Sequence, residues 1–243
     1  MEADNLCKVL EWDSQFFAKR IAKVAVNLLD HDRLDSILRW CVSNQIDCLY
    51  FLADASDGTT IQAVEDQGFR LVDVRVTSER PLTSPPVPED RDVNLKIRPS
   101  REEDIPVLRS IARISFRTTR FYYDTNFPRP LCDALYETWI ENSCRGFDDT
   151  VLVAEVHGVV SGFVTGKLID GKIGEIGLVG VDPNWQGKGL GYDLVNAALQ
   201  WFFEREVQSA WVVTQGRNSQ AQRLYQRCGF LTYLVQLWYH KWF

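Results

Sequence analysis

The sequence predicts an α/β fold with a mixed sheet, in which a smaller N-terminal half precedes a larger C-terminal half. Segments of strand and helix character alternate along the chain, and a glycine-rich loop joins one strand to the helix after it. Four prolines and four charges without apolar periodicity mark residues 81–92 as an extended connection. We therefore expect a domain at residues 1–80, a proline-rich linker at 81–93 and a second domain at 94–243.

The N-terminal half is predicted to alternate helices and strands. The order is helix Asp32–Asn44, strand Cys48–Ala53, helix Thr59–Asp66 and strand Phe69–Ser78. Its end, AVEDQGFRLVDVRV, is similar to LYQRCGFLTYLVQL near the C-terminus, because both combine a helix, Gly-Phe and a long strand. Two interpretations stand, a shortened copy of the C-terminal half or a common type of joint. Because this half lacks a glycine-rich loop, we expect it to bind no coenzyme.

The C-terminal half is predicted to contain one strand, two helices, three strands, and then helix, strand, helix and strand. Its first part comprises strand Asn94–Arg98, helix Glu102–Ile114, a loop through 121–127, helix Leu131–Ser143 and a hairpin of strands Thr150–Val156 and Val159–Leu168. Its second part comprises strand Glu175–Val181, the helix after the glycine-rich loop, strand Ser209–Gln215, a helix from Asn218 to about Cys228 and strand Leu231–Lys241.

The loop QGKGLG at residues 186–191 is the most informative feature of the chain. Its three glycines, at alternate positions, allow backbone N–H groups to point toward one place, and the following helix adds the positive end of its dipole. A Walker loop is excluded, because it needs glycine and Ser or Thr where this chain has Asp182 and Gly189. A dinucleotide fingerprint is excluded by its spacing and by its place in the chain. The loop predicts a pyrophosphate site of another type, with a ligand-free helix entry as the alternative.

A second motif, NSQAQRLYQRCGF, covers residues 218–230. Asn218 is a suitable helix cap, and its spacing from Ala221 and Tyr225 places all three on one helix face. The pattern Q-x-x-G-x-G followed by this motif resembles the GNAT superfamily of N-acyltransferases, in which Asn, Ala, Leu-Tyr and Gly-Phe occur in the same order. The resemblance covers residues 94–243 and implies a GNAT fold, with a smaller GNAT-like α/β half before it.

The GNAT resemblance implies acyl-CoA as co-substrate and no metal. The coenzyme-binding residues that it implies are Leu178, Val179, Val181, Gln186, Gly187, Lys188, Gly189, Leu190, Gly191, Asn218 and Tyr225. It also implies that Tyr225 protonates the leaving thiolate, although a buried helical tyrosine is by itself more often part of a core. Glu175 has the register of the base glutamate in histone-acetylating members. The alternative for Glu175 is a solvent-facing strand carboxylate, with water or a backbone carbonyl as the base.

The expected reaction is direct attack of a neutral amine on the thioester carbonyl, with proximity supplying much of the acceleration. A backbone N–H near Val181, where the motif strand separates from its neighbour, is the expected donor to the oxyanion. Because thiols have a pKa of about 8.5, the leaving group needs little help, and a phenol with a pKa of about 10 can assist it by hydrogen bonding or proton donation.

Two further sequence patches restrict the resemblance to one group of enzymes within the GNAT superfamily. EWDSQFFAKRIAKV near the N-terminus and FRTTRFYYD followed by YETWIENSCRG resemble GNAT members that acylate nucleotide-linked amino sugars. This implies an amino-deoxysugar carried on a nucleoside diphosphate, for which we take dTDP, as the acceptor. The expected substrate-binding residues are Arg117, Arg120, Phe121, Tyr122 and Tyr123, because arginine suits diphosphate oxygens and tyrosine can stack on a base or a sugar. A partly packed, solvated loop is the alternative, and Asp13 and Phe17 are expected to be structural.

Composition limits the other classes of function. A formal charge of −6 and a pI near 5.2 argue against nucleic-acid binding, and no apolar run is long enough to span a membrane. The six cysteines form no CxxC pair, so we expect free thiols in a cytoplasmic protein. The aromatic segment LVQLWYHKWF is a candidate edge strand, which makes a homodimer one option.

Two other functions remain open on the sequence. One is a GNAT enzyme that acylates another small amine or a peptide, which a strongly acidic cleft would favour. The other is a non-catalytic acyl-CoA sensor, against which the presence of Tyr225 argues. The acyl group, the identity of the amino sugar and the position of its amine at C3 or C4 are not encoded in any motif that we recognise.

Overall fold

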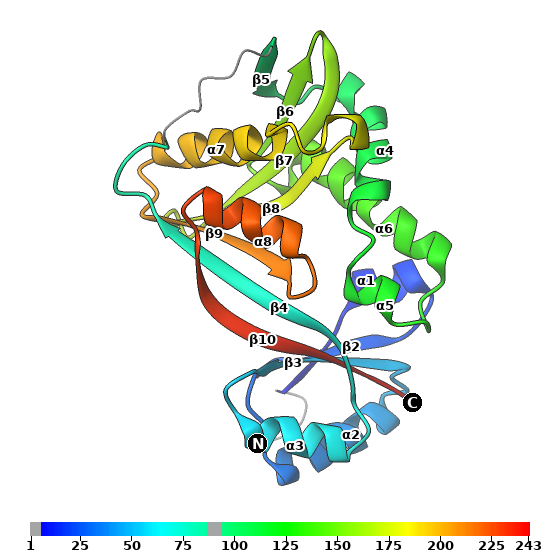
Figure 1. Cartoon of the computed structure of the whole chain (residues 1–243). Helices are drawn as coiled ribbons and strands as arrows, with labels where there is room; N and C mark the ends of the chain where they lie inside the picture. Colours follow the sequence, from blue (N-terminus) through cyan, green and yellow to red (C-terminus); the bar gives the residue numbers. More distant parts are fainter. Residues whose placement is uncertain (1–5, 87–93) are drawn as a thin grey trace.

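A single ten-stranded sheet runs through the whole molecule (Figure 1). The computed structural model describes residues 6–86 and 94–243. The strands are β1 (Cys7–Val9), β2 (Ile21–Val24), β3 (Cys48–Asp54), β4 (Arg70–Pro81), β5 (Leu95–Pro99), β6 (Thr150–Val156), β7 (Val159–Ile169), β8 (Ile173–Val181), β9 (Ser209–Gln215) and β10 (Leu231–Trp242). Their order is β1-β2-β3-β10-β4-β9-β8-β7-β6-β5, with both parallel and antiparallel neighbours, so the predicted mixed α/β class is confirmed.

Helices cover both faces of this sheet. They are α1 (Glu11–Phe17), α2 (His31–Ser43), α3 (Gly58–Asp66), α4 (Ile105–Ser115), α5 (Arg120–Tyr123), α6 (Arg129–Asn142), α7 (Leu190–Phe203) and α8 (Ser219–Arg227), with one-turn elements η2 (Glu102–Asp104), η3 (Ser143–Phe147) and η4 (Pro183–Trp185). We call the face under α7 and α8 the front face, and the face under α1, α4, α5 and α6 the rear face. A third core cluster packs α2 and α3 against the N-terminal strands.

Most predicted elements are present, and the exceptions have local causes. The predictions include no element before residue 32, whereas β1, α1 and β2 lie there. α1 has only seven residues, and its N-cap, Leu10, makes no side-chain capping bond, so the usual start signal is missing. α5 is a single turn within the predicted loop. The predicted helix at Glu102 is α-helical only from Ile105, after a short 3₁₀ turn.

The prediction that the C-terminal aromatic strand is a sheet edge is wrong. β10 pairs antiparallel with β3 on one side and with β4 on the other. Tyr239 lies opposite Phe51 in one register and Leu71 in the other, and its side chain is fully buried. The aromatic content of this strand therefore reflects burial inside the sheet and gives no support for pairing with a second copy.

Strands from both sides of the proline-rich segment alternate in the sheet. β4, which ends at Pro81, lies between β10 and β9, so it joins the N-terminal strands to the C-terminal ones. The predicted linker begins at the end of β4, and its residues 87–93 lie outside the described part of the chain. The proposed division at residues 81–93 thus remains a prediction about separate folding units.

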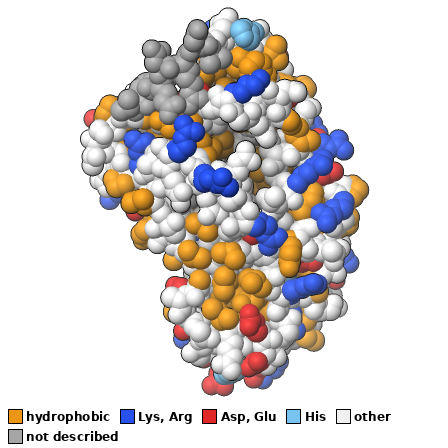
Figure 2. All heavy atoms as spheres, in the orientation of Figure 1, with side chains coloured by type: hydrophobic (Ala, Val, Ile, Leu, Met, Phe, Trp, Pro, Cys, Tyr) orange, Lys and Arg blue, Asp and Glu red, His pale blue; other side chains and the backbone are white. Residues whose placement is uncertain are grey.

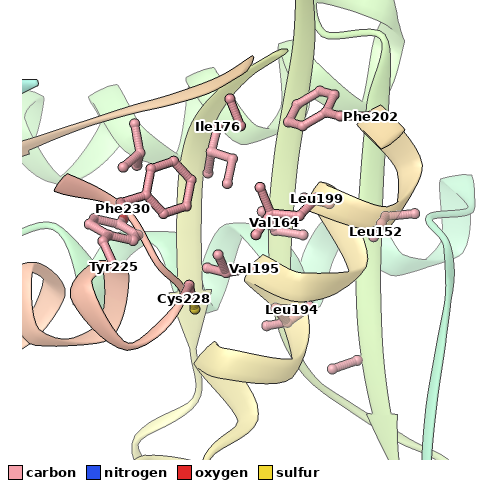
Figure 3. Packing of buried hydrophobic residues seen from close by; sticks show 14 of the residues in the cluster. Leu152, Val164, Ile176, Leu194, Val195, Leu199, Phe202, Tyr225, Cys228 and Phe230 are labelled. Carbon is pink, nitrogen blue, oxygen red and sulfur yellow. The ribbon is translucent and has the colours of Figure 1, made fainter. Parts of the chain in front are cut away.

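The front core is built around close contact between α7 and the sheet (Figure 3). Phe202 of α7 packs on β8 at Gly174, where an added Cβ would lie 2.5 Å from the ring. Figure 3 shows Leu194, Val195 and Leu199 of the same helix turned toward the strands. A side chain at 174 would force the helix away from the sheet, so glycine here serves packing.

A buried polar network joins β10 to α5 on the rear face. Nδ1 of His240 lies 2.7 Å from a carboxylate oxygen of Asp124, and Nε2 lies 2.8 Å from a guanidinium nitrogen of Arg120. The indole N–H of Trp242 donates to the same Asp124 oxygen at 2.9 Å. Because Arg120 only donates, Nε2 must accept, so the imidazole is neutral with its proton on Nδ1.

Burial, together with the nearby Arg120, lowers the pKa of His240 to about 4, although Asp124 acts in the opposite direction. Burial raises the pKa of Asp124, but the hydrogen bonds from His240, Trp242 and the Asn126 backbone outweigh it and lower the value to about 2. Both groups therefore bind protons more readily in the unfolded chain than in the folded one.

We predict that acid weakens the fold through His240. Between pH 6.5, the ordinary histidine value, and pH 4, the unfolded chain takes up a proton that the folded chain refuses. The free energy of unfolding should fall by up to about 1.4 kcal/mol per pH unit in this window. Urea unfolding at several pH values measures the slope. His240→Gln should be less stable at pH 7 but should lose less stability toward pH 4, whereas the exposed His157→Gln should follow the wild type. An equal slope in His240→Gln would exclude this histidine as the cause.

Candidate functional site

The site is organised by the separation of two neighbouring strands. β8 and β9 pair in parallel only as far as Ile176 and Val212. Beyond this point β8 continues to Val181 beside β7, and β9 continues to Gln215 beside β4. One edge of the β8 backbone after Ile176 is therefore left without a partner strand in the described structure, so its polar groups are available to a ligand. This agrees with the predicted separation near Val181.

The loop between β8 and α7 is held in a conformation that needs glycine. Gly187 and Gly189 have φ angles of +75° and +87°, in the left-handed region. The Gln186 side-chain amide donates to the Val181 carbonyl at 3.0 Å, which ties the loop to the end of β8. The N–H groups of the first turn of α7 follow directly, and they have no acceptor within the helix. This geometry suits an anionic group at the start of α7.

A cavity of about 410 Å³ lies beside this loop, which we call the front cavity. Its lining residues come from the end of α4, from β8, from the loop and from α7 and α8: Ser115, Val179, Val181, Trp185, Gln186, Gly187, Gly189, Leu190, Gly191, Tyr192, Asn218, Gln220, Ala221, Arg223, Leu224, Tyr225 and Arg227. Two arginines and no described carboxylate line it. Figure 2 shows a hollow on this face with Lys and Arg side chains around it. The front cavity is thus basic in a chain of net charge −6.

Tyr225 lies on α8 with its ring against Phe230, at the border between the core and the front cavity (Figure 3). Its side chain is 6% exposed, and no hydrogen bond to its hydroxyl is formed by the residues that the structure describes. Burial and the neighbouring Cys228 raise its pKa well above the ordinary value of 10. The phenol is therefore protonated at neutral pH and able to donate to a ligand in the cavity.

Asn218 begins α8 and closes the front cavity on one side. Its side-chain oxygen accepts from the Ala221 N–H at 3.1 Å, so the predicted helix cap is present. The side-chain amide group keeps its donors, since the cap uses only the oxygen. Gly191 allows the two helices to approach, because an added Cβ would lie 3.2 Å from Leu224 of α8.

The structure brings most of the predicted coenzyme residues into the front cavity, and two of them lie elsewhere. Leu178 lines a second cavity, because successive residues of a strand point to opposite faces. Lys188 is in the loop, and its ammonium lies 4.5 Å from the Trp185 ring centroid rather than on the cavity wall.

The second cavity, of about 710 Å³, lies between the rear face of the sheet and the helices α1 and α6, and we call it the rear cavity. Its lining residues are Trp12, Asp13, Trp139, Asn142, Ser143, Phe147, Asp148, Thr165, Lys167, Glu175, Gly177 and Leu178. Three aromatic rings and three carboxylates therefore surround it. Gly177 and Leu178 of the rear cavity are adjacent in β8 to Val179 of the front cavity, so the two cavities meet where β8 leaves β9.

Glu175 is a partly buried carboxylate in the rear cavity. Burial raises its pKa above 4.5, Arg75 and Lys167 act to lower it, and Asp148 acts to raise it. A carboxylate with a raised pKa beside an unpaired backbone edge is suited to accept a proton from an attacking nucleophile. The structure thus puts the two predicted catalytic residues on opposite sides of β8, Glu175 behind it and Tyr225 in front.

The predicted substrate cluster is divided by the structure. Phe121 is 2% exposed and packs against Phe17 and Phe127, and Tyr122 is buried with its hydroxyl bonded to Asp133. Both rings are part of the core and present no surface to a ligand.

The other three members of that cluster have different surroundings. Arg120 is used internally: it bonds His240, and its guanidinium carbon lies 4.3 Å from the Tyr50 ring centroid and 4.5 Å from that of Trp238. Tyr123 is half exposed under Arg217 of the β9–α8 loop, and Arg117 is exposed. None of the five lines either cavity.

Trp12 and Asp13 line the rear cavity, although sequence reasoning had assigned Asp13 a structural role. The ring of Trp12 stacks on Phe16 at 4.9 Å between centroids, and Phe17 anchors α1 in the core. The WDSQFF patch contains all of these residues, so the signal was present, but nothing in it shows which side chains face a cavity.

Two further classes of feature are absent from the described residues. No group of three or more His, Cys, Asp or Glu side chains is placed to hold a metal ion. No helix within residues 6–86 and 94–243 has the length and apolar character required to cross a bilayer.

Comparison with known proteins identifies the fold and the family. Residues 112–230 match the model of the Acetyltransferase (GNAT) family. Over 238 residues the chain is 28% identical to the dTDP-fucosamine acetyltransferase of Escherichia coli O6:H1, with 96% of each chain covered. Over 147 residues it is 26% identical to the spore coat polysaccharide biosynthesis protein SpsD of Bacillus subtilis, a match that covers 60% of this chain and only 50% of SpsD.

A solved structure supports the same assignment. The GCN5-related N-acetyltransferase from Sphaerobacter thermophilus superposes with a TM-score of 0.70 at 19% identity, over 97% of this chain and 76% of that one. At this identity the likeness concerns the fold, and it includes the N-terminal strands as well as the matched domain. Together the family match and the relatives show that residues 112–230 belong to a GNAT acetyltransferase domain and that the protein is an N-acetyltransferase.

Proposed function

We propose that the protein transfers an acyl group from acyl-CoA to the amino group of a nucleotide-linked amino-deoxysugar, with dTDP as the nucleotide. The observation that supports this most directly is the meeting of a basic front cavity and an aromatic, carboxylate-lined rear cavity at the separated part of β8. A donor thioester and an acceptor amine can then reach the same backbone edge from opposite sides. The acceptor class is supported by the relative whose name specifies dTDP-fucosamine.

The front cavity suits acyl-CoA. The left-handed glycines and the start of α7 offer backbone N–H groups to a pyrophosphate, and Arg223 and Arg227 add positive charge. The unpaired edge of β8 offers N–H groups to the thioester oxygen, and Tyr225 directs a protonated hydroxyl at the place where a thiolate would leave.

The rear cavity suits the acceptor. Aromatic side chains such as Trp12 and Trp139 can stack on the apolar face of a deoxysugar, and carboxylates can accept hydrogen bonds from its amine and hydroxyl groups. Glu175 is the candidate base, because it lies two residues before Gly177 on the strand that borders both cavities. Attack forms the C–N bond, breaks the C–S bond, and requires that the ammonium lose a proton to Glu175 while the thiolate gains one from Tyr225.

One observation favours a different acceptor. Asp13, Asp148 and Glu175 line the rear cavity together with a single cation, Lys167. Such an acidic surface also suits a polyamine or the N-terminus of a peptide, which carry no phosphate. Acetylation of a non-sugar amine is therefore the second candidate, and a non-catalytic acyl-CoA sensor is the third.

We further propose that the protein acts in the cytoplasm and contributes to a surface polysaccharide such as an O-antigen. All six cysteines are free thiols, which suits a reducing compartment. The names of the two relatives refer to dTDP-fucosamine and to spore coat polysaccharide.

A thiol-release assay tests the function. Acetyl-CoA is offered with dTDP-linked 3-amino and 4-amino dideoxysugars, and with spermidine and a short peptide as controls. We expect CoA release with at least one dTDP-linked sugar and none with the controls. Release with a control alone would overturn the sugar acceptor and leave the fold and donor intact. No release with any acceptor, tested also with longer acyl-CoAs, would favour the sensor.

We predict that Tyr225→Phe lowers kcat at least tenfold and leaves the affinity for acetyl-CoA unchanged, because the ring stays while the proton donor is lost. Steady-state kinetics and desulfo-CoA titration measure the two quantities. Tyr233→Phe, which removes an exposed hydroxyl from β10, should change neither. An unaltered kcat in Tyr225→Phe would remove this hydroxyl from the mechanism.

We predict that Glu175→Gln lowers kcat at least tenfold and removes the acidic limb of the pH–rate profile. In the wild type the base works only when it is ionised, so kcat should rise as the pH passes the pKa of Glu175. Burial raises this pKa above its ordinary value of 4.5. Asp170→Asn, at the exposed turn of the same hairpin, should keep both the rate and the limb. Persistence of the limb in Glu175→Gln would assign it to another group.

A further inference from the structure

Two partly buried cations on the rear face of the sheet have no carboxylate partner. Lys23 lies on β2 and Arg75 on β4, and neither forms an ion pair with any residue that the structure describes. The Arg75 guanidinium donates to the neutral side chain of Gln236 at 2.8 Å, and the Lys23 ammonium lies 5.3 Å from the Trp238 ring centroid. Lysine and arginine side chains are rarely buried without a carboxylate partner, so the presence of two such cations needs an explanation.

Strand register places these cations on the same face as Glu175. Glu175 pairs with Trp211 of β9, and the same face of β9 continues to Gln215, which pairs with Arg75. Arg75 in turn pairs with Gln236 of β10. Because paired residues share a face and alternate residues return to it, one side of the sheet carries all of these side chains.

The same face extends to Lys23. Gln236 and Trp238 are alternate residues of β10, and Trp238 lies between two cations, Lys23 and Arg120. Lys23 pairs with Tyr50 of β3, which pairs with His240 of β10. The rear face thus carries a track of polar and aromatic side chains from Glu175 of β8 across β9, β4, β10 and β3 to Lys23 of β2.

Neither cation lines the rear cavity, but each acts on one of the carboxylates that do. Arg75 is close enough to Glu175 to act on its pKa, and Lys23 is close enough to Asp13 to do the same. Glu175 and Asp13 line opposite parts of the rear cavity, on β8 and on α1. The cations therefore lie beside the cavity on its sheet side.

More positive than negative groups act on Lys23, which suits a bound anion beside it. Burial lowers the pKa of Lys23, and the positive charges of Arg120 and Arg75 lower it further, while only Asp13 opposes them. Arg120 is already engaged with His240 and with the rings of Tyr50 and Trp238, so it is not free to move toward a ligand. An anion between Lys23 and Arg75 would replace like-charge repulsion with attraction in a partly desolvated place.

We propose that Lys23 and Arg75 bind the phosphate groups of the acceptor, so that a phosphate-bearing amino sugar extends from Glu175 along the rear face toward β2. This inference rests on the proposed function and specifies which residues read the nucleoside diphosphate. Arginine engages phosphate oxygens through two parallel donors, and lysine adds a mobile point charge. The acidic wall then holds the amine while these cations hold the phosphates, which explains why one cavity has neighbours of both signs.

The proposal gives the N-terminal half a direct role. β2 and β4 come from the half that lacks a glycine-rich loop, and each supplies one cation. The N-terminal half, which we expect to bind no coenzyme, then supplies the site for the phosphates of the acceptor. The continuous sheet fixes the position of this site relative to Glu175.

Calorimetric titration with dTDP tests the proposal directly. The front cavity is first saturated with desulfo-CoA, so that dTDP cannot be bound there. Wild type should bind dTDP and, more weakly, inorganic pyrophosphate. Lys23→Gln and Arg75→Gln should each weaken dTDP binding at least tenfold while desulfo-CoA binding is unchanged. Arg70→Gln, which removes an exposed arginine from the same strand as Arg75, is the matched control and should bind as the wild type does.

The charge itself is tested by Lys23→Arg, which should retain dTDP binding. Failure of the wild type to bind either dTDP or pyrophosphate would overturn the proposal, and so would unchanged binding in both glutamine variants. Loss of binding in Lys23→Arg equal to that in Lys23→Gln would also overturn it, because shape and not charge would then be decisive. The proposed function fails separately: acetylation of spermidine or a peptide alone in the thiol-release assay rejects the sugar acceptor whatever the titration shows.

Discussion

The twelve residues of β10 pair with β3 on one side and with β4 on the other, and this double pairing joins strands from opposite ends of the chain. Without it β1, β2 and β3 would share no sheet with β4 and the acetyltransferase domain, because β3 reaches β4 only through β10 and β4 pairs with β9 on its other edge. Backbone hydrogen bonds in a twisted sheet allow little freedom between neighbouring strands. The continuous sheet therefore fixes the distance between Glu175 in one half and the cations Lys23 and Arg75 in the other.

The same sheet is interrupted in the one place where chemistry is proposed. β8 and β9 part after Ile176, and the edge that becomes free is bordered by one cavity in front and another behind. Where β8 still pairs with both β7 and β9, its polar groups are used within the sheet and are not available to a thioester. Glycines at 174 and 180 allow Phe202 and Phe163 to pack directly on β8, so both faces of the strand stay covered by core side chains where it separates from β9.

Charge is distributed between the two cavities according to what each is proposed to hold. The front cavity has arginines and the N-terminus of α7, which suits the phosphates of a coenzyme. The rear cavity has carboxylates at its wall and unpaired cations beside it, which suits a molecule with an amine at one end and phosphates at the other. The buried Asp124–His240–Arg120 network lies between α5 and β10, where it supports the rear layer without taking part in either cavity.

Where sequence reasoning failed, the missing information was spatial. The FRTTRFYY segment has the composition of a ligand site, yet Phe121 and Tyr122 are turned into the core by the single turn of α5. Lys23 and Arg75 are 52 residues apart, in the segments EWDSQFFAKRIAKV and AVEDQGFRLVDVRV, and nothing in either segment marks these two side chains, because only strand register brings them to one face. The aromatic content of the C-terminal segment predicts a strand but not its number of neighbours, so the prediction of an edge strand is wrong.

The sequence alone predicts the α/β class, the glycine-rich loop and the capped helix of Asn218 and Tyr225, and these features carry the resemblance to the GNAT family. These features are local, since turn chemistry, helix caps and short spacings act within a few residues. The tertiary structure was needed to show that β10 lies inside the sheet, that Trp12 and Asp13 line the rear cavity and that Lys23 and Arg75 lie on the same face of the sheet as Glu175. Those outcomes depend on strand pairing between segments far apart in the chain, which no local pattern encodes.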